Sequence, residues 1–359
     1  ALAEEPARYR DTIAAFLDRP EMVLDPETAA VLAEHDLRSE QLDAFLAETE
    51  ARSTAGGGTA SAASLLELLT LYGTSHPGRY RLLRGFLARM EMGALDVETR
   101  GAAAAARRRL EQGFRAWLGP PSRIAVDPET GLEYRWDDVI AFSEEVDDET
   151  RRRLRSAIAG TTLLKEGIFL FSAGTMVRLD DILPQGVWVR LLGSDHGKSV
   201  YRIAVKVRDG NQHDLALNLN RSLSPEDVAQ ETHWLIVCGD DRTRSALVET
   251  FGGLWPEHGL WTEEFIPGET LTVALRRLAR RAGGGELLHG LWPFAAWSAI
   301  GAYVDFWNRT GRHETIADPT PSNVIVPMHD YHLGSRLVSI SNRAPFPGIP
   351  VSRIEIPVM

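Results

Sequence analysis

The pattern of apolar residues changes near residue 170, and this change constrains the fold more than any other feature of the chain. Before it, from about residue 6 to residue 118, apolar residues recur at three- and four-residue spacing, which is typical of amphipathic helices. After it, runs such as GVWVRLL and SVYRIAVKVR are rich in β-branched and aromatic residues, as expected for strands. The sequence therefore predicts an α+β protein in which a helical part precedes a sheet.

We expect three parts along the 359 residues. Residues 1–118 are predicted to form an all-helical bundle domain, because no strand pattern interrupts their helical periodicity. Residues 119–169 are predicted to form a connecting hairpin, indicated by IAVDPETGLEYRW, and one further helix. Residues 170–359 then begin with strands separated by short turns, which predicts an antiparallel meander. An apolar fraction of 44% is that of a globular protein with a core.

Composition argues against several classes of function. The formal net charge of −11 argues against a nucleic-acid partner, because such binding depends on Lys and Arg residues that neutralise phosphates. Cys238 is the only cysteine, which excludes an intramolecular disulfide and a cysteine-based metal cluster. The histidines have no ligand spacing, so no histidine metal site is predicted. We find no apolar run long enough to span a bilayer and no signal peptide, and therefore expect a cytoplasmic protein without membrane association.

The Gly-Lys-Ser triplet at residues 197–199 is similar to the end of a P-loop, but its context is different. A P-loop has four residues between its two glycines, whereas only three separate Gly193 from Gly197. A P-loop also leads from a strand into a helix, whereas both flanks here have the pattern of strands. We therefore predict a hairpin at this position.

A second motif, IADPTPSN, places four residues between Asp318 and Asn323. An apolar helix pattern precedes it and the strand pattern VIV follows it, and together they resemble the catalytic loop of the protein-kinase-like family. In that family the Asp orients or deprotonates the acceptor hydroxyl, and the Asn holds a metal ion on the phosphates. The resemblance, which covers about residues 170 to 345, implies ATP and Mg²⁺ as cofactors, Asp318 as a catalytic residue and Asn323 as a metal ligand.

Two other stretches are similar to parts of the same family. WTEEFIPGETL resembles the strand and hinge that contact the adenine edge, which implies that Glu263 and Phe265 bind the nucleotide. Glu231 matches the helix glutamate that pairs with a strand lysine in kinases, and the alternative is a solvated helix residue.

The predicted hairpin resembles the Gly-rich loop that covers the nucleotide phosphates in kinases. Aligning SVYR with the segment after that loop places Gly193 at its first glycine and Lys198 at its third, which implies nucleotide binding by Gly193, Gly197 and Lys198. LALN replaces the usual VALK, so Asn218 stands where kinases have a phosphate-contacting lysine. The with-no-lysine kinases supply their lysine from the third-glycine position. We therefore expect Lys198 to reach inward to the phosphates or to the helix glutamate, with a turn lysine as the alternative.

The metal site departs from the family pattern. The strand RLVSIS aligns with the family's KLIDFG and places Ser339 where kinases have their metal-binding aspartate. A serine hydroxyl is a weaker magnesium ligand than a carboxylate, so Mg²⁺ binding is expected to be weakened. Asn342 or Asp330 would take this role if the register differs. Only about twenty residues follow this strand, too few for an activation segment and the helical platform that binds protein substrates.

The expected architecture is a kinase-like two-lobed module, with a sheet lobe at 170–262 and a shortened helical lobe at 263–359, preceded by the all-helical domain. Loss of the lysine and of the metal-binding aspartate favours a pseudokinase with weak or absent nucleotide binding. It would act as a regulatory or scaffolding module, with a protein partner at the helical domain. The alternative is an atypical ATP-dependent phosphotransferase or nucleotidyl transferase that uses Asp318, Asn323 and Lys198. A third class, a helical interaction protein with an incidental β module, would lack a cleft between lobes.

Overall fold

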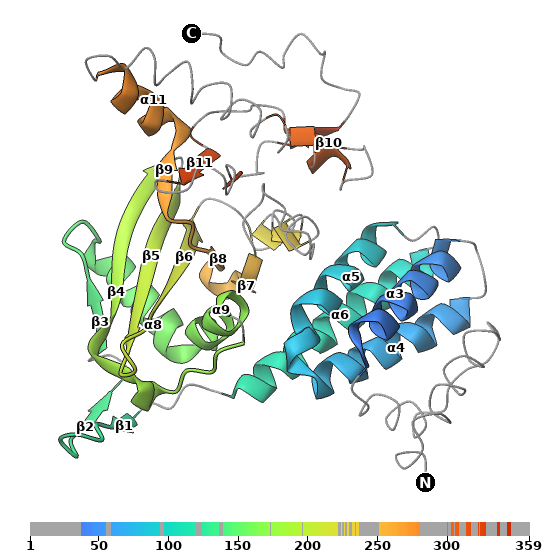
Figure 1. The fold of residues 1–359 in the computed structure, drawn as a ribbon, viewed down its shortest axis with the longest axis horizontal. Helices are drawn as coiled ribbons and strands as arrows, with labels where there is room; N and C mark the ends of the chain where they lie inside the picture. Colours follow the sequence, from blue (N-terminus) through green and yellow to red (C-terminus); the bar gives the residue numbers. More distant parts are fainter. Residues whose placement is uncertain are drawn as a thin grey trace. The chain divides into compact units, whose positions relative to one another are not determined.

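The structure is a computed structural model, and its fold is shown in Figure 1. It describes residues 37–119, 124–221 and 251–280 apart from short gaps at 55–58, 94–96, 136–138, 173 and 196, together with single positions between 224 and 236 and short segments between 300 and 345. The chain divides into two compact units, Ala1–Pro120 and Pro121–Met359. The division falls close to the predicted end of the helical domain at residue 118.

The described part of the first unit consists of helices. They are α3 (Ser39–Thr54), α4 (Thr59–Ser75), α5 (Tyr80–Gly93) and α6 (Val97–Leu118), with a 3₁₀ turn η2 (Pro77–Arg79) between α4 and α5. α6 buries Ala103, Ala106, Leu110 and Phe114 at three- and four-residue spacing, which is the periodicity of one helix face.

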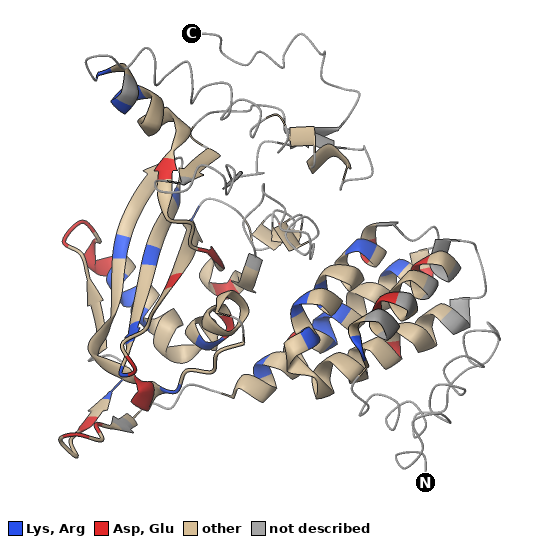
Figure 2. Cartoon of the chain, in the orientation of Figure 1, with Lys and Arg blue, Asp and Glu red and all other residues tan. Residues whose placement is uncertain are grey.

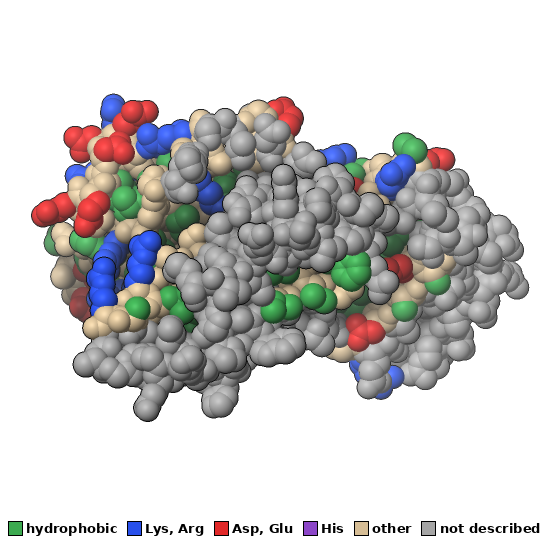
Figure 3. All heavy atoms as spheres, turned by 90° about the horizontal axis from the view of Figure 1, so that it is seen from above, with side chains coloured by type: hydrophobic (Ala, Val, Ile, Leu, Met, Phe, Trp, Pro, Cys, Tyr) green, Lys and Arg blue, Asp and Glu red, His purple; other side chains and the backbone are tan. Residues whose placement is uncertain are grey.

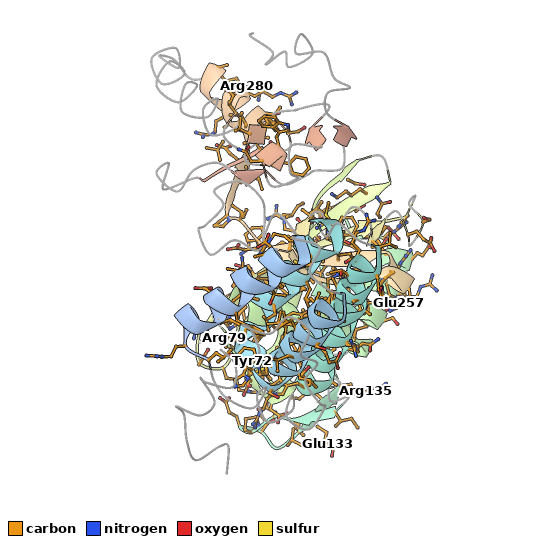
Figure 4. The ribbon with its side chains drawn as sticks, turned by 90° about the vertical axis from the view of Figure 1, so that its right-hand side faces the viewer. Tyr72, Arg79, Glu133, Arg135, Glu257 and Arg280 are labelled. Atoms are coloured by element: carbon orange, nitrogen blue, oxygen red, sulfur yellow. The ribbon has the colours of Figure 1, made fainter. Side chains whose placement is uncertain are left out.

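Aromatic and polar contacts join the helices of this unit. The Tyr80 ring on α5 stacks on the Phe114 ring of α6, with 3.8 Å between their centroids. Near the start of α3, the Leu37 N–H donates to the Tyr72 hydroxyl and the Leu37 carbonyl accepts from Arg79, both at 3.3 Å. Tyr72 and Arg79 are labelled in Figure 4.

The second unit begins with the predicted hairpin and continues into helices. β1 (Ile124–Val126) pairs antiparallel with β2 (Glu133–Arg135), as the sequence predicts. β3 (Ile140–Phe142), α8 (Asp148–Gly160) and α9 (Leu163–Phe171) follow.

The single helix predicted after the hairpin is wrong, because the chain breaks at Thr161 into α8 and α9. The Thr161 backbone is extended, and its hydroxyl donates to the Ala157 carbonyl at 2.7 Å while accepting from the Leu163 N–H at 3.2 Å. A threonine side chain that satisfies backbone groups locally in this way ends one helix and begins the next.

A six-stranded sheet forms the centre of the second unit and is visible in Figure 1. Its strand order is β3-β4-β5-β6-β8-β7, with β3 parallel to β4 and all other neighbours antiparallel. The strands after β3 are β4 (Ile182–Asp195), β5 (Lys198–Val207), β6 (Gln212–Asn220), β7 (Phe251–Trp255) and β8 (Leu260–Glu264). The α+β class is therefore confirmed, and the predicted meander corresponds to β4, β5 and β6.

One face of this sheet carries the core. Alternate residues of β5 and β6 are fully buried aliphatic side chains, and helix α9 contacts β6, β7 and β8. The cluster includes Leu154, Ile158, Leu163, Ile168, Val187, Val189, Ile203, Val205, Leu215 and Leu217. The opposite face of the same strands carries polar and charged residues, and the candidate site lies on that face.

Short elements make up the rest of the described chain. α11 (Leu271–Ala279) follows β9 (Gly268–Thr270), which forms a three-stranded sheet with β11 (Val324–Pro327) and β12 (Arg336–Leu337). β10 (Glu314–Ile316) pairs with β13 (Arg343–Pro345). Most of the apolar helix predicted near residues 287–311 lies outside the described residues, as does most of the helix that contains Glu231.

Candidate functional site

The predicted site residues fall into two groups. The structure describes Gly193, Gly197, Lys198, Glu263 and Phe265. Of the residues predicted for catalysis, Lys198 is described, whereas Asp318 and Glu231 lie outside the described residues. The predicted metal ligand Asn323 and Ser339, at the aligned metal position, also lie outside them. The site can therefore be built from the sheet residues alone.

The predicted hairpin is confirmed, and it is formed by β4 and β5. Asp195 and Lys198 are the last paired residues before the turn, and Gly197 in the turn has a φ of 83°, which glycine adopts without steric cost. Gly193 is exposed and lies in β4, where the register shifts between Leu191 and Gly193. Strands on both sides of the triplet exclude a P-loop, which requires a helix after its lysine.

Strand register places Lys198, Asn218 and Trp261, from three neighbouring strands, on one face of the sheet. Asn218 of β6 pairs with Val200 of β5 on one side and with Trp261 of β8 on the other. Lys198 precedes Val200 by two residues and therefore lies on the same face, since side chains alternate along a strand. This face is the one opposite to the leucine-rich core.

Lys198 and Trp261 meet across the intervening strand. The Lys198 Nζ lies 5.0 Å from the centroid of the Trp261 ring, within the range of a cation–π contact. Because β5 and β8 are both neighbours of β6, their backbones are separated by two strand spacings, about 9.5 Å. The two side chains therefore meet over the segment of β6 that contains Asn218, and Lys198 points inward along the sheet face.

The Asn218 side chain lies buried beneath this contact. It is 3% exposed, and its Nδ2 has no hydrogen-bond partner among the residues that the structure describes. Buried side-chain donors are nearly always satisfied, and an unsatisfied one costs about 1–3 kcal/mol. Position 218 is thus occupied by a buried amide donor.

A second cation crosses β6 in the same way. The Arg202 guanidinium lies 4.8 Å from the Phe265 ring centroid, and its path passes over Ala216, whose small side chain leaves room. Arg202 also donates two hydrogen bonds to Asp214, from Nε to Oδ1 and from Nη2 to Oδ2, each 3.0 Å long. This bidentate pair holds the guanidinium in place and balances its charge.

Basic residues are concentrated on this part of the sheet. Arg190 of β4 is the register partner of Arg202 on β5, and Figure 2 shows basic positions side by side on these two strands. Figure 3 shows long basic side chains lying side by side on the surface.

Glu263 and Phe265 lie where the sheet ends. The Glu263 carboxylate is buried and accepts a hydrogen bond from the Trp261 Nε1 at 2.5 Å, so its charge is held inside the sheet. The ladder between β6 and β8 ends at the pair Leu215 and Glu264, which leaves Phe265 beyond the last pair. Phe265 is half-buried and forms the aromatic partner of Arg202.

Sequence reasoning missed Trp261, Arg202 and Asp214 as members of this face. Each lies in a segment correctly predicted as a strand or near a hinge, but the pairing register is needed to bring them together. The presence of a lysine, an arginine and an asparagine at even spacing along adjacent predicted strands is the available signal.

Comparison with family models and with curated proteins gives no match. No protein-family model matches it, and no curated protein matches it in sequence. Across the described part of the chain, no group of three or more His, Cys, Asp and Glu residues is placed to hold a metal ion. None of the described helices is long and apolar enough to cross a membrane.

Proposed function

We propose that this chain is a degenerate kinase-like protein, a pseudokinase, that binds a nucleotide weakly and acts as a regulatory or scaffolding module. The observation that carries the proposal is the direction of Lys198, which lies over Trp261 on the polar face of the sheet. A turn lysine without a role would extend into solvent. In the kinase resemblance, the Gly-rich loop covers the nucleotide phosphates. A lysine that points inward from the end of a glycine-containing hairpin supports this role for the hairpin of β4 and β5.

The order of elements also supports a kinase-like sheet lobe. The hairpin of β4 and β5, strand β6, and then β7 and β8 before Phe265 follow the order expected for such a lobe. The described residues fit the phosphate part of ATP, because Lys198 supplies a cation and Asn218 a buried donor on one face. ATP would supply the phosphates that these two residues bind.

Among the side chains that the structure describes, this face offers little to a metal ion. The described carboxylates, Asp214 and Glu263, already accept hydrogen bonds from Arg202 and Trp261. With Ser339 at the aligned metal position in the sequence, we expect phosphoryl transfer to be slow, because such transfer depends on metal ions that neutralise developing charge. The absence of a lysine at position 218 is also expected to slow phosphoryl transfer.

The alternative function is an atypical ATP-dependent phosphotransferase or nucleotidyl transferase. It is supported by the same inward Lys198 together with the spacing of Asp318 and Asn323 in the sequence. In this case Lys198 would contact the phosphates, Asp318 would accept the proton of the acceptor hydroxyl, and Asn323 would hold Mg²⁺.

Thermal unfolding with and without ATP tests the proposal, because a ligand that binds only the folded state raises its stability. We expect millimolar ATP to raise the melting temperature of the wild type and to have little effect on Lys198→Met. Lys206→Met is the matched control, since Lys206 is an exposed residue at the other end of the same strand. It should respond to ATP as the wild type does.

Two results would count against these functions, and a third would decide between them. Absence of any shift in the wild type rejects nucleotide binding, and an equal shift in Lys198→Met rejects the role of Lys198. A shift that requires Mg²⁺ or Mn²⁺ and disappears in Asn323→Ala, with turnover of ATP, supports the transferase over the pseudokinase.

A further inference from the structure

We infer that the Asn218 side chain donates directly to a phosphate oxygen, so that nucleotide binding at this face does not need a divalent cation. The inference rests on the proposed function, because it specifies how the polar face of the sheet would hold the nucleotide. In the kinase resemblance, Asn218 stands where a lysine is missing, and the resemblance gives the asparagine itself no role.

The first argument is the unmatched donor. Asn218 is 3% exposed, and its Nδ2 has no partner within the described residues. Its two register neighbours offer no acceptor, because Val200 is apolar and the Trp261 Nε1 is a donor already bound to Glu263. The two directly paired residues therefore give the Asn218 donor no side-chain acceptor, which fits a ligand that brings the acceptor.

The second argument concerns the charge of that ligand. Lys198 lies over the same segment of β6 and brings a positive charge to it. Lys198 lies over Trp261, the cross-strand neighbour of Asn218, and an ammonium and an amide N–H both favour an anionic oxygen. A phosphate satisfies both donors at once, whereas a neutral sugar or base oxygen matches the amide but not the charge of the ammonium.

The third argument concerns the metal. A Mg²⁺ ion on the phosphates needs oxygen ligands from the protein, and carboxylates are the ligands it prefers. Asp214 accepts from Arg202 and from Gln212, and Glu263 accepts from Trp261. The Asn218 Nδ2 cannot coordinate a cation, so the partner of this unmatched donor would be a phosphate oxygen and not a metal ion.

Lys198 contacts the residue that neighbours the donor. Because Lys198 lies over Trp261, the cross-strand neighbour of Asn218, we expect its ammonium to move from the indole ring to a phosphate bound at Asn218. Binding at the two residues is therefore coupled, and we expect loss of either residue to remove most of the affinity.

The experiment measures binding of ATP and of inorganic tripolyphosphate by calorimetry, once in EDTA and once in Mg²⁺. The wild type should bind both ligands in EDTA, and Mg²⁺ should not strengthen binding, because metal-bound phosphate oxygens are weaker acceptors. Asn218→Asp, which keeps the shape and replaces the donor by a carboxylate, should weaken binding in EDTA by about tenfold to a hundredfold. Asn211→Asp is the matched control, since it adds the same charge at an exposed turn.

A second variant separates binding from folding. Asn218→Leu removes the unsatisfied donor while filling a similar volume, so we expect the unliganded melting temperature to stay equal or rise while phosphate binding is lost. A fall in affinity in this variant cannot result from a less stable protein if its melting temperature is unchanged or higher.

The outcomes distinguish this inference from the proposed function. Binding by the wild type in Mg²⁺ but not in EDTA overturns the inference and leaves the proposed function in place. Unchanged affinity in EDTA for Asn218→Leu also overturns it, because the amide would then serve only the folded structure. Absence of binding in both buffers rejects the proposed function itself.

Discussion

Arg202 and Asp214 are joined by two hydrogen bonds of 3.0 Å, which form a bidentate pair between the adjacent strands β5 and β6. Arg202 lies over Phe265 and has its charge balanced by a bidentate carboxylate on the adjacent strand. Lys198, four residues earlier, lies over Trp261 near the buried amide of Asn218. The bidentate pair therefore gives Arg202 a structural role, and nucleotide binding by Lys198 is the role proposed above.

The first prediction concerns the pair itself. Asp214→Asn removes the charge that holds Arg202, and both side chains are only a quarter to a third exposed, at 33% and 25%. We expect the free energy of unfolding to fall by about 1 kcal/mol, measured by urea denaturation. Glu129→Gln is the control, because Glu129 is 80% exposed and lies 3.9 Å from its cation, Arg208. If the two substitutions lowered the free energy of unfolding equally, the Arg202–Asp214 pair would stabilise the protein no more than an exposed ion pair does.

The second prediction concerns the close approach of α9 to β7. A Cβ atom at Gly253 would lie 2.7 Å from the Glu166 Oε1 and 2.7 Å from the Trp255 Cη2, in a region where both side chains are buried. Gly253→Ala should therefore cost about 1–3 kcal/mol of stability.

The control for this substitution is an exposed helical glycine. At Gly101 on α6, an added Cβ atom would have no heavy atom within 4 Å, so Gly101→Ala should stabilise the helical unit by about 0.5–1 kcal/mol. Thermal unfolding followed by circular dichroism measures both. A tolerated alanine at Gly253 would mean that α9 can move away from β7.

The third prediction concerns acid sensitivity at the start of α8. Hydrogen bonds from the Thr150 hydroxyl and N–H, at 2.6 and 2.8 Å, together with the nearby Arg221, hold the pKa of the Asp147 carboxyl below its usual range. Because the folded-state pKa is depressed, this carboxylate stabilises the protein above the unfolded-state pKa of about 4. The contribution is lost as the pH falls through the folded-state value.

Asp147→Ala should therefore lower stability at pH 7, and the difference from the wild type should shrink as the pH falls below 4. Urea denaturation of the wild type and of Asp147→Ala, at pH 7 and at a pH below 4, measures this difference in the free energy of unfolding. Asp148→Ala is the neighbouring control, because Asp148 is 93% exposed and lies 3.6 Å from its cation, Arg151. A difference for Asp147→Ala that does not change with pH would contradict the assignment.

The fourth prediction concerns the helical unit. Phe114 is 1% exposed and stacks on Tyr80, which is fully buried, at 3.8 Å. Phe114→Ala leaves a cavity between α5 and α6 and should cost about 3–5 kcal/mol. Trp117→Ala, at a position 44% exposed on the same helix, should cost less than about 1 kcal/mol. Thermal unfolding of the two variants measures these costs. A similar loss of stability in both would show that Phe114 is not a central residue of the core of this unit.

Local sequence patterns predicted many elements of the fold because each depends on residues close in the chain. The Pro/Gly turn between β1 and β2 and the strands β4, β5 and β6 follow from alternation and turn residues. Two local predictions were wrong. Thr161 ends a helix that was predicted to continue, and the strands predicted from residue 170 onward are preceded by the 3₁₀ turn η3 (Leu179–Asp181).

The 3₁₀ turn has a local cause that hydropathy does not record. The Asp181 carboxylate accepts from the Arg178 N–H at 2.7 Å, and the Asp181 N–H donates to the Arg178 carbonyl at 3.1 Å. These bonds close a tight turn in place of an extended strand, because a short acidic side chain competes for backbone donors.

By itself, the sequence determined the helical first unit, the hairpin at Gly197 and the absence of a lysine at position 218, since these depend on residue identity and local periodicity. Only the tertiary structure decided that Lys198 meets Trp261 over Asn218, because that contact joins strands β5 and β8 across a third strand. A change of register by one residue would move each of these side chains to the opposite face of the sheet. Register depends on packing of the whole sheet against α8 and α9, and no short stretch of sequence contains that information.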